Sequence, residues 1–243
     1  MVSAKYKEIF MHINSPILLA RLAGLTYVIL ILSGVFGIAS VPASLIQWAD
    51  PAATIANIKN SEALFRLAIT GQLICFISFI LLPFLLYKLL ASVSPTAGFF
   101  MLAFSLVSVP VLLVSVVCHV NVLHLIGDSP YLQQFSKEAI QLQVMQSLAI
   151  SNNCATITNI FAGLWLFPFG YLVIKSGLLP KILGYLLILG CFGYLYEFVA
   201  GFILALGTSP WYVGLAGNLG VFAIALWLLV LGVRKQKESY ESI

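Results

Sequence analysis

Long apolar runs separated by short polar connections form the main pattern of this chain. Six of them match or exceed the roughly 20 residues that a helix needs to cross a bilayer. They extend over about residues 16–46, 63–90, 98–126, 140–174, 182–206 and 211–233. The pattern therefore predicts an all-α fold, a single domain over residues 1–243 that forms an integral membrane bundle of six transmembrane helices.

The clearest local signal lies within residues 161–196, where two apolar runs meet at a short basic turn. The turn reads Lys175-Ser176-Gly177-Leu178-Leu179-Pro180-Lys181. Glycine is favoured just past the end of a helix, and proline cannot continue the helix that precedes it. We therefore expect a helical hairpin whose first arm ends just before Gly177.

The first apolar run has two features of a secretory signal. Basic residues precede it, and Ala39–Ala43 resembles a small-residue cleavage region. The run nevertheless continues to Ile46, which makes it longer than the apolar core of a usual signal peptide. We therefore expect an uncleaved first span.

Prolines inside three of the runs predict bends, because proline removes a helix hydrogen bond and crowds the preceding turn. These prolines are Pro83, Pro110 and Pro168. The fourth run is about 35 residues long and is the most polar. It exceeds one crossing, so we expect it to tilt or to begin outside the hydrocarbon.

Composition supports a membrane environment. The chain is 61% apolar and 8% charged, whereas soluble domains carry about 25% charged residues. The net charge of +4 arises from residues at the ends of the apolar runs, which favours contact with lipid headgroups over nucleic acid binding. The four cysteines fall in four different runs without a C-x-x-C pair, as expected of small buried apolar residues.

The distribution of basic residues predicts the orientation. One set of connections, together with both termini, carries nine of them: Lys5, Lys7, Arg21, Lys88, Lys175, Lys181, Arg234, Lys235 and Lys237. The opposite connections carry three: Lys59, Arg66 and Lys137. Because cytoplasmic loops are enriched in Lys and Arg, we expect both termini in the cytoplasm.

Three stretches of the sequence resemble a known family. They are L-W-L-F-P-F-G-Y-L-V-I-K-S-G-L-L-P-K-I-L-G at Leu164–Gly184, followed by G-Y-L at Gly193–Leu195, and the shorter A-R-L-A-G-L-T-Y at Ala20–Tyr27 and L-F-R-L-A-I at Leu64–Ile69. The chain in these stretches is similar to a bacterial family of multi-pass membrane proteins catalogued as domain of unknown function 4386. The resemblance implies a multi-span fold in the bacterial inner or plasma membrane, and it carries over no catalytic or binding residues. We expect no cofactor.

Polar residues inside the runs concentrate in the half of the bundle expected to face outward. Ionisable and polar groups at membrane depth usually face protein or water, so they are candidates for a site. The candidate ligand-binding residues are Arg66, Gln72, His119, Gln146, Asn152, Thr156, Asn159, Glu197 and Asn218. Two stripes have helical spacing, one at Ser108, Ser115 and His119 and one at Asn152, Thr156, Asn159 and Gly163. They predict a polar pocket open to the extracytoplasmic side, or alternatively contacts that pack the helices together.

Charged and metal-ligating residues give less specific signals. Glu197 is expected to pair with Arg66 or His119, since an unpaired charge at that depth is costly. His119 and His124 are five residues apart, about 140° around a helix, which disfavours a metal site. Histidines on a single run also disfavour haem held by two histidines. No phosphate-binding loop or nucleophile elbow is present, and no serine has an evident base beside it.

Three functions fit these observations. The first is a membrane protein without enzymatic activity that binds or moves a small or lipidic ligand. The second is an intramembrane enzyme that uses His119 and Glu197. The third is a structural or accessory subunit whose polar stripes meet a partner. The expected surroundings are the lipid bilayer, with a homo-oligomer left open, and no nucleic acid or metal.

Overall fold

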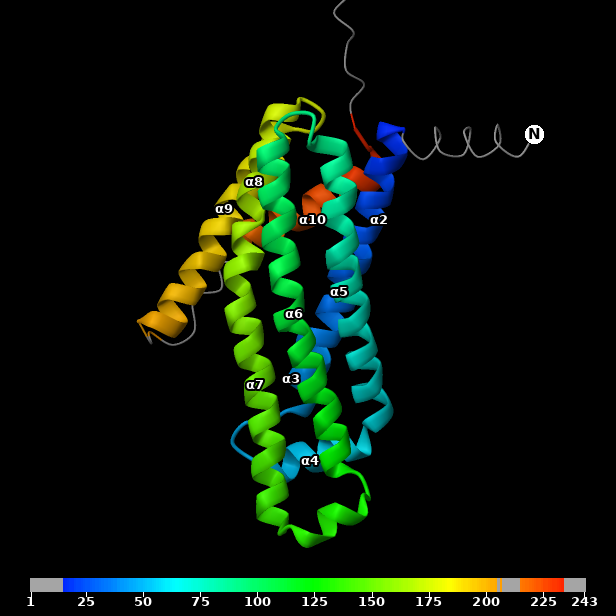
Figure 1. The fold of residues 1–243 in the computed structure, drawn as a ribbon, viewed down its shortest axis with the longest axis vertical. Coiled ribbons are helices and arrows are strands. Elements are labelled where there is room, and N and C mark those ends of the chain that lie inside the picture. The colour runs from blue at the N-terminus through cyan, green and yellow to red at the C-terminus, as the bar shows by residue number, and fades with distance from the viewer. Residues whose placement is uncertain (1–14, 205, 207–214, 234–243) are drawn as a thin grey trace, which may run out of the picture. The chain divides into compact units, whose positions relative to one another are not determined.

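The described residues of the computed structural model, 15–204, 206 and 215–233, fold into helices joined by short connections (Figure 1). The predicted all-α class is confirmed for this part of the chain. The elements are α2 (Pro16–Gly34), η1 (Val35–Ser40), α3 (Val41–Leu45), α4 (Pro51–Asn60), α5 (Glu62–Leu90), α6 (Pro95–Ile126), η2 (Pro130–Gln134), α7 (Lys137–Leu164), α8 (Leu166–Ser176), α9 (Lys181–Phe198), η3 (Val199–Ile203) and α10 (Leu215–Val230). The polar N-terminal segment, the expected beginning of the sixth run at Trp211 and the basic tail from Arg234 lie outside the described residues.

Five helical stretches are long and apolar enough to cross a membrane. Among the described residues they are Pro16–Leu45, Glu62–Leu90, Pro95–Ile126, Lys137–Ser176 and Lys181–Ile203. The last helix, α10, has 16 residues, so it rises about 24 Å at 1.5 Å per residue. This is shorter than a hydrocarbon core of about 30 Å. The lengths and composition fit a multi-pass membrane protein.

The helices pack into two compact units. The first comprises residues 1–28, 81–105 and 160–243, and the second comprises residues 29–80 and 106–159. The helices α2, α5, α6 and α7 each contribute one segment to each unit. Of the nine polar candidates, Glu197 and Asn218 lie in the first unit and the other seven lie in the second.

Close glycine contacts characterise the first unit. A Cβ atom added to Gly170 on α8 would lie 2.6 Å from the carbonyl oxygen of Gly184 on α9. A Cβ atom on Gly190 of α9 would lie 2.6 Å from the Cα atom of Gly217 on α10. Helices in lipid gain stability from close packing of this kind, since burial of apolar surface provides little driving force there.

The predicted hairpin is confirmed. The helix α8 ends at Ser176, and Gly177 follows with φ 65° and ψ −5°, the left-handed conformation that glycine adopts without steric cost. The next helix, α9, begins at Lys181 directly after Pro180. The sequence stretch that carries the family resemblance therefore forms two packed helices and the turn between them.

The three prolines predicted to cause bends differ in their effect on the helix that contains them. Pro83 and Pro110 lie inside helices that continue through them, α5 and α6. Before Pro168, in contrast, α7 ends at Leu164 and α8 starts at Leu166. Pro168 has no N–H for the carbonyl of Leu164, four residues earlier, and its ring crowds that carbonyl. The bend predicted at Pro168 thus takes the form of an interruption at Trp165.

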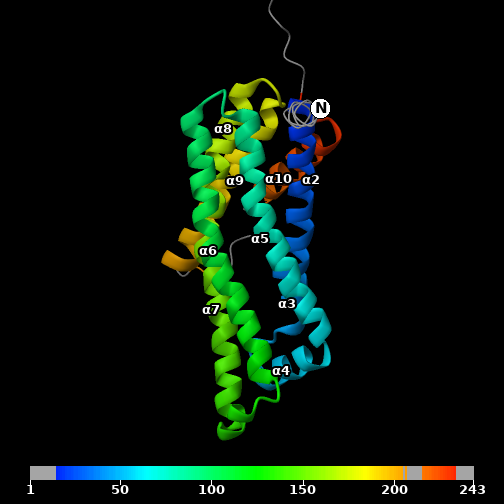
Figure 2. The ribbon, with the colours of Figure 1, turned by 45° about the vertical axis from the view of Figure 1, so that its right-hand side comes forward.

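The second unit contains η1, α3, α4 and segments of α5, α6 and α7. Figure 2 shows α4 beside the end of α3 and the start of α5. The helix α4 begins after Asp50, whose Oδ1 accepts a hydrogen bond of 2.9 Å from the N–H of Ala53, with Pro51 at the first helical position. Thr54 Oγ1 then accepts from Gln47 N–H at 2.8 Å and donates to the Gln47 carbonyl at 2.9 Å. These bonds fix the segment between α3 and α4.

Candidate functional site

The site in the second unit begins with an irregular turn in the first apolar run. Between α2 and α3 the helix widens into a π-helical turn, in which Val41 N–H donates to the Phe36 carbonyl five residues earlier. The same register assigns the Gly37 carbonyl to the N–H of residue 42. That residue is Pro42, which has no N–H. The turn therefore leaves the Gly37 carbonyl without its intrahelical donor.

Gln72 on α5 supplies the missing donor. Its Nε2 group donates a hydrogen bond of 2.8 Å to the Gly37 carbonyl, and Gln72 is only 2% exposed. The two backbones approach closely, because a Cβ atom on Gly37 would lie 2.6 Å from the Ala68 carbonyl oxygen and 2.8 Å from the Gln72 nitrogen. Glycine at position 37 is thus required for this contact, and the contact fixes the orientation of the Gln72 amide.

His119 on α6 continues the connection to α7. Gln72 Oε1 lies 3.0 Å from His119 Nδ1, and His119 Nε2 lies 3.2 Å from the hydroxyl of Ser151. The Ser151 hydroxyl in turn lies 2.6 Å from that of Ser115. The Phe65 ring packs against the imidazole with centroids 5.6 Å apart and an interplanar angle of 86°. We call Gly37, Gln72, His119, Ser151 and Ser115 the polar chain.

The polar chain has one consistent direction. Because Gln72 Nε2 donates to Gly37, its Oε1 faces His119 and can only accept, so Nδ1 carries the proton. In the neutral ring Nε2 is then an acceptor, and it accepts a hydrogen bond from the Ser151 hydroxyl. Ser151 in turn accepts from Ser115. Every donor in these bonds points toward the Gly37 carbonyl, and each of the buried polar groups in the chain has a hydrogen-bond partner.

A cavity of about 220 Å³ lies against the polar chain. Its polar lining consists of Gln72, Ser115, His119, Ser151 and Asn152, and the rest includes Trp48 and aliphatic residues of the π turn, α3 and α7. In the part of the chain that the structure describes, none of the lining residues is Lys, Arg, Asp or Glu. The cavity is therefore amphipathic and, while His119 is neutral, uncharged.

A second, smaller hydrogen-bond network lies one turn away along α7. Asn121 Nδ2 donates to the Ser147 hydroxyl at 2.9 Å, and that hydroxyl donates to the Gln143 carbonyl at 2.9 Å. It joins α6 to α7 without histidine. Polar contacts of this kind are the interhelical links that the sequence offers as the alternative to a pocket.

The structure brings three of the nine predicted site residues to one cavity: Gln72, His119 and Asn152. Gln146 is exposed, and the Thr156 hydroxyl donates to the Asn152 carbonyl of its own helix at 3.1 Å. Asn159 is half-buried and does not line this cavity. Glu197 on α9 is half-buried and Asn218 on α10 is exposed, and both belong to the first unit.

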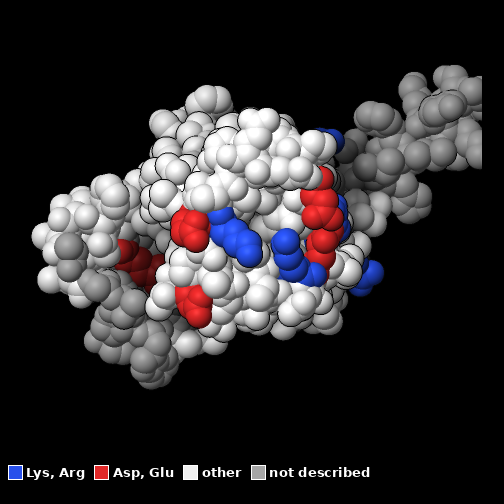
Figure 3. Space-filling model, turned by 90° about the horizontal axis from the view of Figure 1, so that it is seen from below, with Lys and Arg blue, Asp and Glu red and all other residues white. Residues whose placement is uncertain are grey.

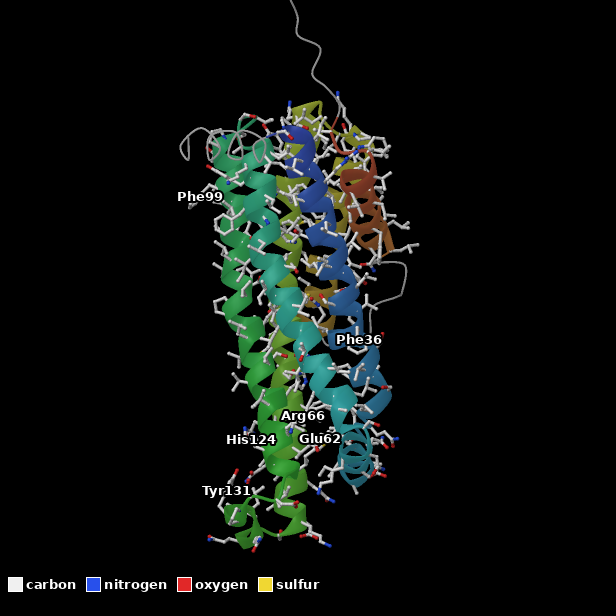
Figure 4. The ribbon with its side chains drawn as sticks, turned by 90° about the vertical axis from the view of Figure 1, so that its right-hand side faces the viewer. Phe36, Glu62, Arg66, Phe99, His124 and Tyr131 are labelled. Atoms are coloured by element: carbon white, nitrogen blue, oxygen red, sulfur yellow. The ribbon has the colours of Figure 1, made fainter. Side chains whose placement is uncertain are left out.

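The predicted ion pair of Glu197 with Arg66 or His119 is wrong, because Arg66 and His119 both have other partners. Arg66 pairs with Glu62, one turn earlier on α5, at 2.7 Å. Both side chains are largely exposed, and Figure 4 shows them at the level of His124 on α6. His119 uses both ring nitrogens for Gln72 and Ser151. An intrahelical pair is the simpler solution, since residues four apart on a helix are neighbours.

Two further differences concern serine. The buried polar face of α7 carries Ser147, Ser151 and Thr158, whereas Asn152 and Asn153 are exposed. The expectation that no serine has a base beside it is also wrong, because His119 lies within hydrogen-bonding distance of Ser151. The stripe at Ser108, Ser115 and His119 on α6, in contrast, is buried as a face. Ser151 was detectable in principle by its spacing from Ser147, four residues earlier.

Charged side chains gather at the end of the second unit that carries α4 (Figure 3). The described charged residues of this unit are Asp50, Lys59, Glu62, Arg66, Asp128, Lys137 and Glu138. They lie just before and on α4, at the start of α5, and before and at the start of α7. The charges thus mark the ends of the helices, and the polar chain lies in their uncharged interior.

Comparison with known proteins identifies a family. No curated protein matches the chain, and no solved structure matches it. The model of one family, described as Domain of unknown function (DUF4386), matches residues 22–232. The match includes the π turn, the polar chain and the α8–α9 hairpin, and it confirms the resemblance seen in the sequence. The chain therefore belongs to the DUF4386 family.

Proposed function

We propose that this protein crosses the cell membrane six times with both termini in the cytoplasm and binds a small uncharged ligand in the cavity beside the polar chain. The ligand enters from the extracytoplasmic side. The observation that carries the proposal is the cavity itself, which combines an aliphatic wall with hydrogen-bonding groups from three helices. Small-molecule sites usually have this composition, with a mostly apolar lining and a few placed polar groups.

The neutral lining argues for an uncharged ligand. A charge at membrane depth is costly unless a partner of opposite sign or water compensates it. No lining residue among those described carries a permanent charge, and both imidazole nitrogens are already engaged. An ion bound here would lack a counter-charge, whereas hydroxyl, carbonyl or amide groups find partners of matching polarity.

The size of the cavity limits the ligand further. Its volume of about 220 Å³ lies below the roughly 300–1,000 Å³ of sites for drug-sized molecules. At about 30 Å³ per water, it has room for about seven waters. The ligand, or the part of it that enters, is therefore a small group such as a short acyl chain or a small alcohol.

The distribution of charge supports the proposed orientation. The described residues of the second unit include four acidic and three basic side chains. Those of the first unit include four basic side chains and one acidic one: Arg21, Lys88, Lys175, Lys181 and Glu197. Basic excess favours the cytoplasmic side. In this proposal the apolar run that contains α10 makes the sixth crossing, which returns the chain to the side on which it began.

A second candidate function is structural. The polar chain joins the π turn to α5, α5 to α6 and α6 to α7, and hydrogen bonds of this kind hold helices together in lipid. If that is its whole role, the cavity is a packing gap with no occupant. Access to the cavity separates the two functions.

Access can be measured with a cysteine at position 152. In protein whose four native cysteines are replaced, we expect Asn152→Cys to react with hydroxyethyl methanethiosulfonate at least tenfold faster than Ile150→Cys. Asn152 lines the cavity, whereas Ile150 lies on the same helix, is 43% exposed and does not line it. The reaction requires the thiolate, which forms in water and hardly in hydrocarbon.

The side of entry follows from the same variants in intact cells. An impermeant thiosulfonate added outside should react with the thiol of Gln146→Cys and so block its later labelling. Gln146 is exposed and, in the proposed orientation, lies nearer the outer end of α7. Equal and slow reaction of Asn152→Cys and Ile150→Cys would favour the structural role. If the Gln146→Cys thiol reacts with the impermeant reagent only after the cells are opened, the proposed orientation is contradicted.

A further inference from the structure

We propose that Ser151 is a nucleophile activated by His119, and that the cavity takes an uncharged ester or thioester whose acyl carbon Ser151 attacks. This inference rests on the proposed function, because the acyl compound must enter the cavity. It assigns that ligand to the esters and thioesters and proposes that the protein cleaves it. It also differs from an enzyme built on His119 and Glu197, since Glu197 has no part in it.

The geometry is that of a nucleophile, a base and a group that orients the base. The Ser151 hydroxyl lies 3.2 Å from His119 Nε2, and His119 Nδ1 lies 3.0 Å from Gln72 Oε1. Serine, histidine and an acceptor in this order recur in acyl-transfer enzymes on unrelated folds. An amide in the third place selects the Nδ1–H tautomer, as a carboxylate does, without placing a negative charge in the membrane.

The orientation of the base is unusually well determined. The Gly37 carbonyl, freed by Pro42, holds the Gln72 amide so that its oxygen faces the imidazole. The Phe65 ring packs edge to face against that imidazole. His119 and Gln72 are 5% and 2% exposed, so bulk water has little access to the hydrogen bond between them. The base thus presents Nε2 to Ser151 in the tautomer that accepts a proton.

Two further groups can support the negative charge that forms during the attack. The Ser115 hydroxyl, 2.6 Å from the Ser151 hydroxyl, donates to Ser151 at rest and can turn its O–H toward the acyl oxygen once Ser151 Oγ has bonded to the acyl carbon. The Asn152 amide lines the same cavity and offers N–H donors. Fixed donors near a developing oxyanion usually contribute strongly to acyl transfer. We assign them this role by their chemistry and their place in the lining.

The reaction balances with water as the only co-reactant. Ser151 Oγ forms a bond to the acyl carbon, and its proton passes to His119 Nε2. The bond from the acyl carbon to the alkoxide or thiolate breaks, and the leaving group takes the proton from His119. Water then attacks the acyl-serine with the same base, releasing the carboxylic acid and restoring the Ser151 hydroxyl.

Reaction with a serine-directed probe tests the proposal without knowledge of the natural substrate. The full chain in detergent is treated with diisopropyl fluorophosphate, and with the smaller methanesulfonyl fluoride in parallel. The Ser151 oxygen replaces fluoride at phosphorus or sulfur while His119 takes the proton. We expect mass spectrometry of peptides to place the label on Ser151, and His119→Ala to slow labelling at least 100-fold.

Ser147→Ala is the matched control. Ser147 lies one turn from Ser151 on the same buried face of α7, but its partners are Asn121 and the Gln143 carbonyl. We expect this variant to label at the wild-type rate. Mapping of the label on wild-type protein keeps the test decisive even where a variant fails to fold.

Three outcomes would overturn the proposal: no label on Ser151 with either probe in folded protein, a label only on another residue, or unchanged labelling of folded His119→Ala. Reaction of Asn152→Cys together with an inert Ser151 would leave the binding site standing and remove the nucleophile. If Asn152→Cys does not react with the thiosulfonate and Ser151 does not react with either probe, both the binding site and the nucleophile are contradicted.

Discussion

Replacing Gln72 with leucine should lower the free energy of unfolding by about 2–4 kcal/mol. The change leaves the Gly37 carbonyl and His119 Nδ1 without their partner, and each buried group left unpaired costs about 1–3 kcal/mol. Titration with denaturing detergent in mixed micelles would measure the loss. Gln146→Leu removes the same side chain from an exposed position of α7 and should change stability by no more than about 0.5 kcal/mol.

The combination with Pro42→Ala tests the reason for this effect. Alanine restores an N–H at position 42, in register with the Gly37 carbonyl. In that background Gln72→Leu should cost at least about 1 kcal/mol less, since one of the two groups has a new donor. Additive effects of the two substitutions would contradict the account of the π turn.

Replacing Gly190 with leucine should lower the free energy of unfolding by at least about 3 kcal/mol. Overpacking in cores usually costs about 1–3 kcal/mol, and here the obstacle is the Gly217 backbone, 2.6 Å from the new Cβ atom. The backbone cannot rotate away as a side chain can, so α9 and α10 must separate. The same detergent titration provides the measurement.

Gly127→Leu serves as the control for this substitution. Gly127 follows the end of α6, is exposed, and the nearest atoms to a new Cβ lie at 3.4 Å and 3.5 Å, an ordinary contact distance. Its effect should stay within about 0.5 kcal/mol. Equal losses for the two glycines would show that leucine disturbs this protein for reasons other than the α9–α10 contact.

Periodicity predicted those parts of the molecule that depend on local sequence. The apolar runs predicted the five long helices, and Gly177 with Pro180 predicted the hairpin turn. The buried face of α6 followed from the spacing of Ser108, Ser115 and His119. Each of these features depends on residues within one helix or one turn.

The site itself was only partly predictable, because its geometry depends on contacts between helices. The sequence indicates Gln72 and His119 as polar residues inside apolar runs, but its polarity pattern favours the more polar Asn152 over Ser151. The role of Gly37 was not visible in the sequence, since its carbonyl matters only once a π turn and Pro42 leave it free. The position of α7 relative to α6 likewise depends on packing.

The direction of the polar chain is the central claim, and nitrogen NMR of histidine-labelled protein tests it most directly. Comparison with His119→Gln identifies the His119 resonances among those of the three histidines. We expect a neutral ring with the proton on Nδ1 and an unprotonated Nε2 that accepts a hydrogen bond from Ser151. A proton on Nε2, with Nδ1 unprotonated, would contradict the chain, and with it the activation of Ser151.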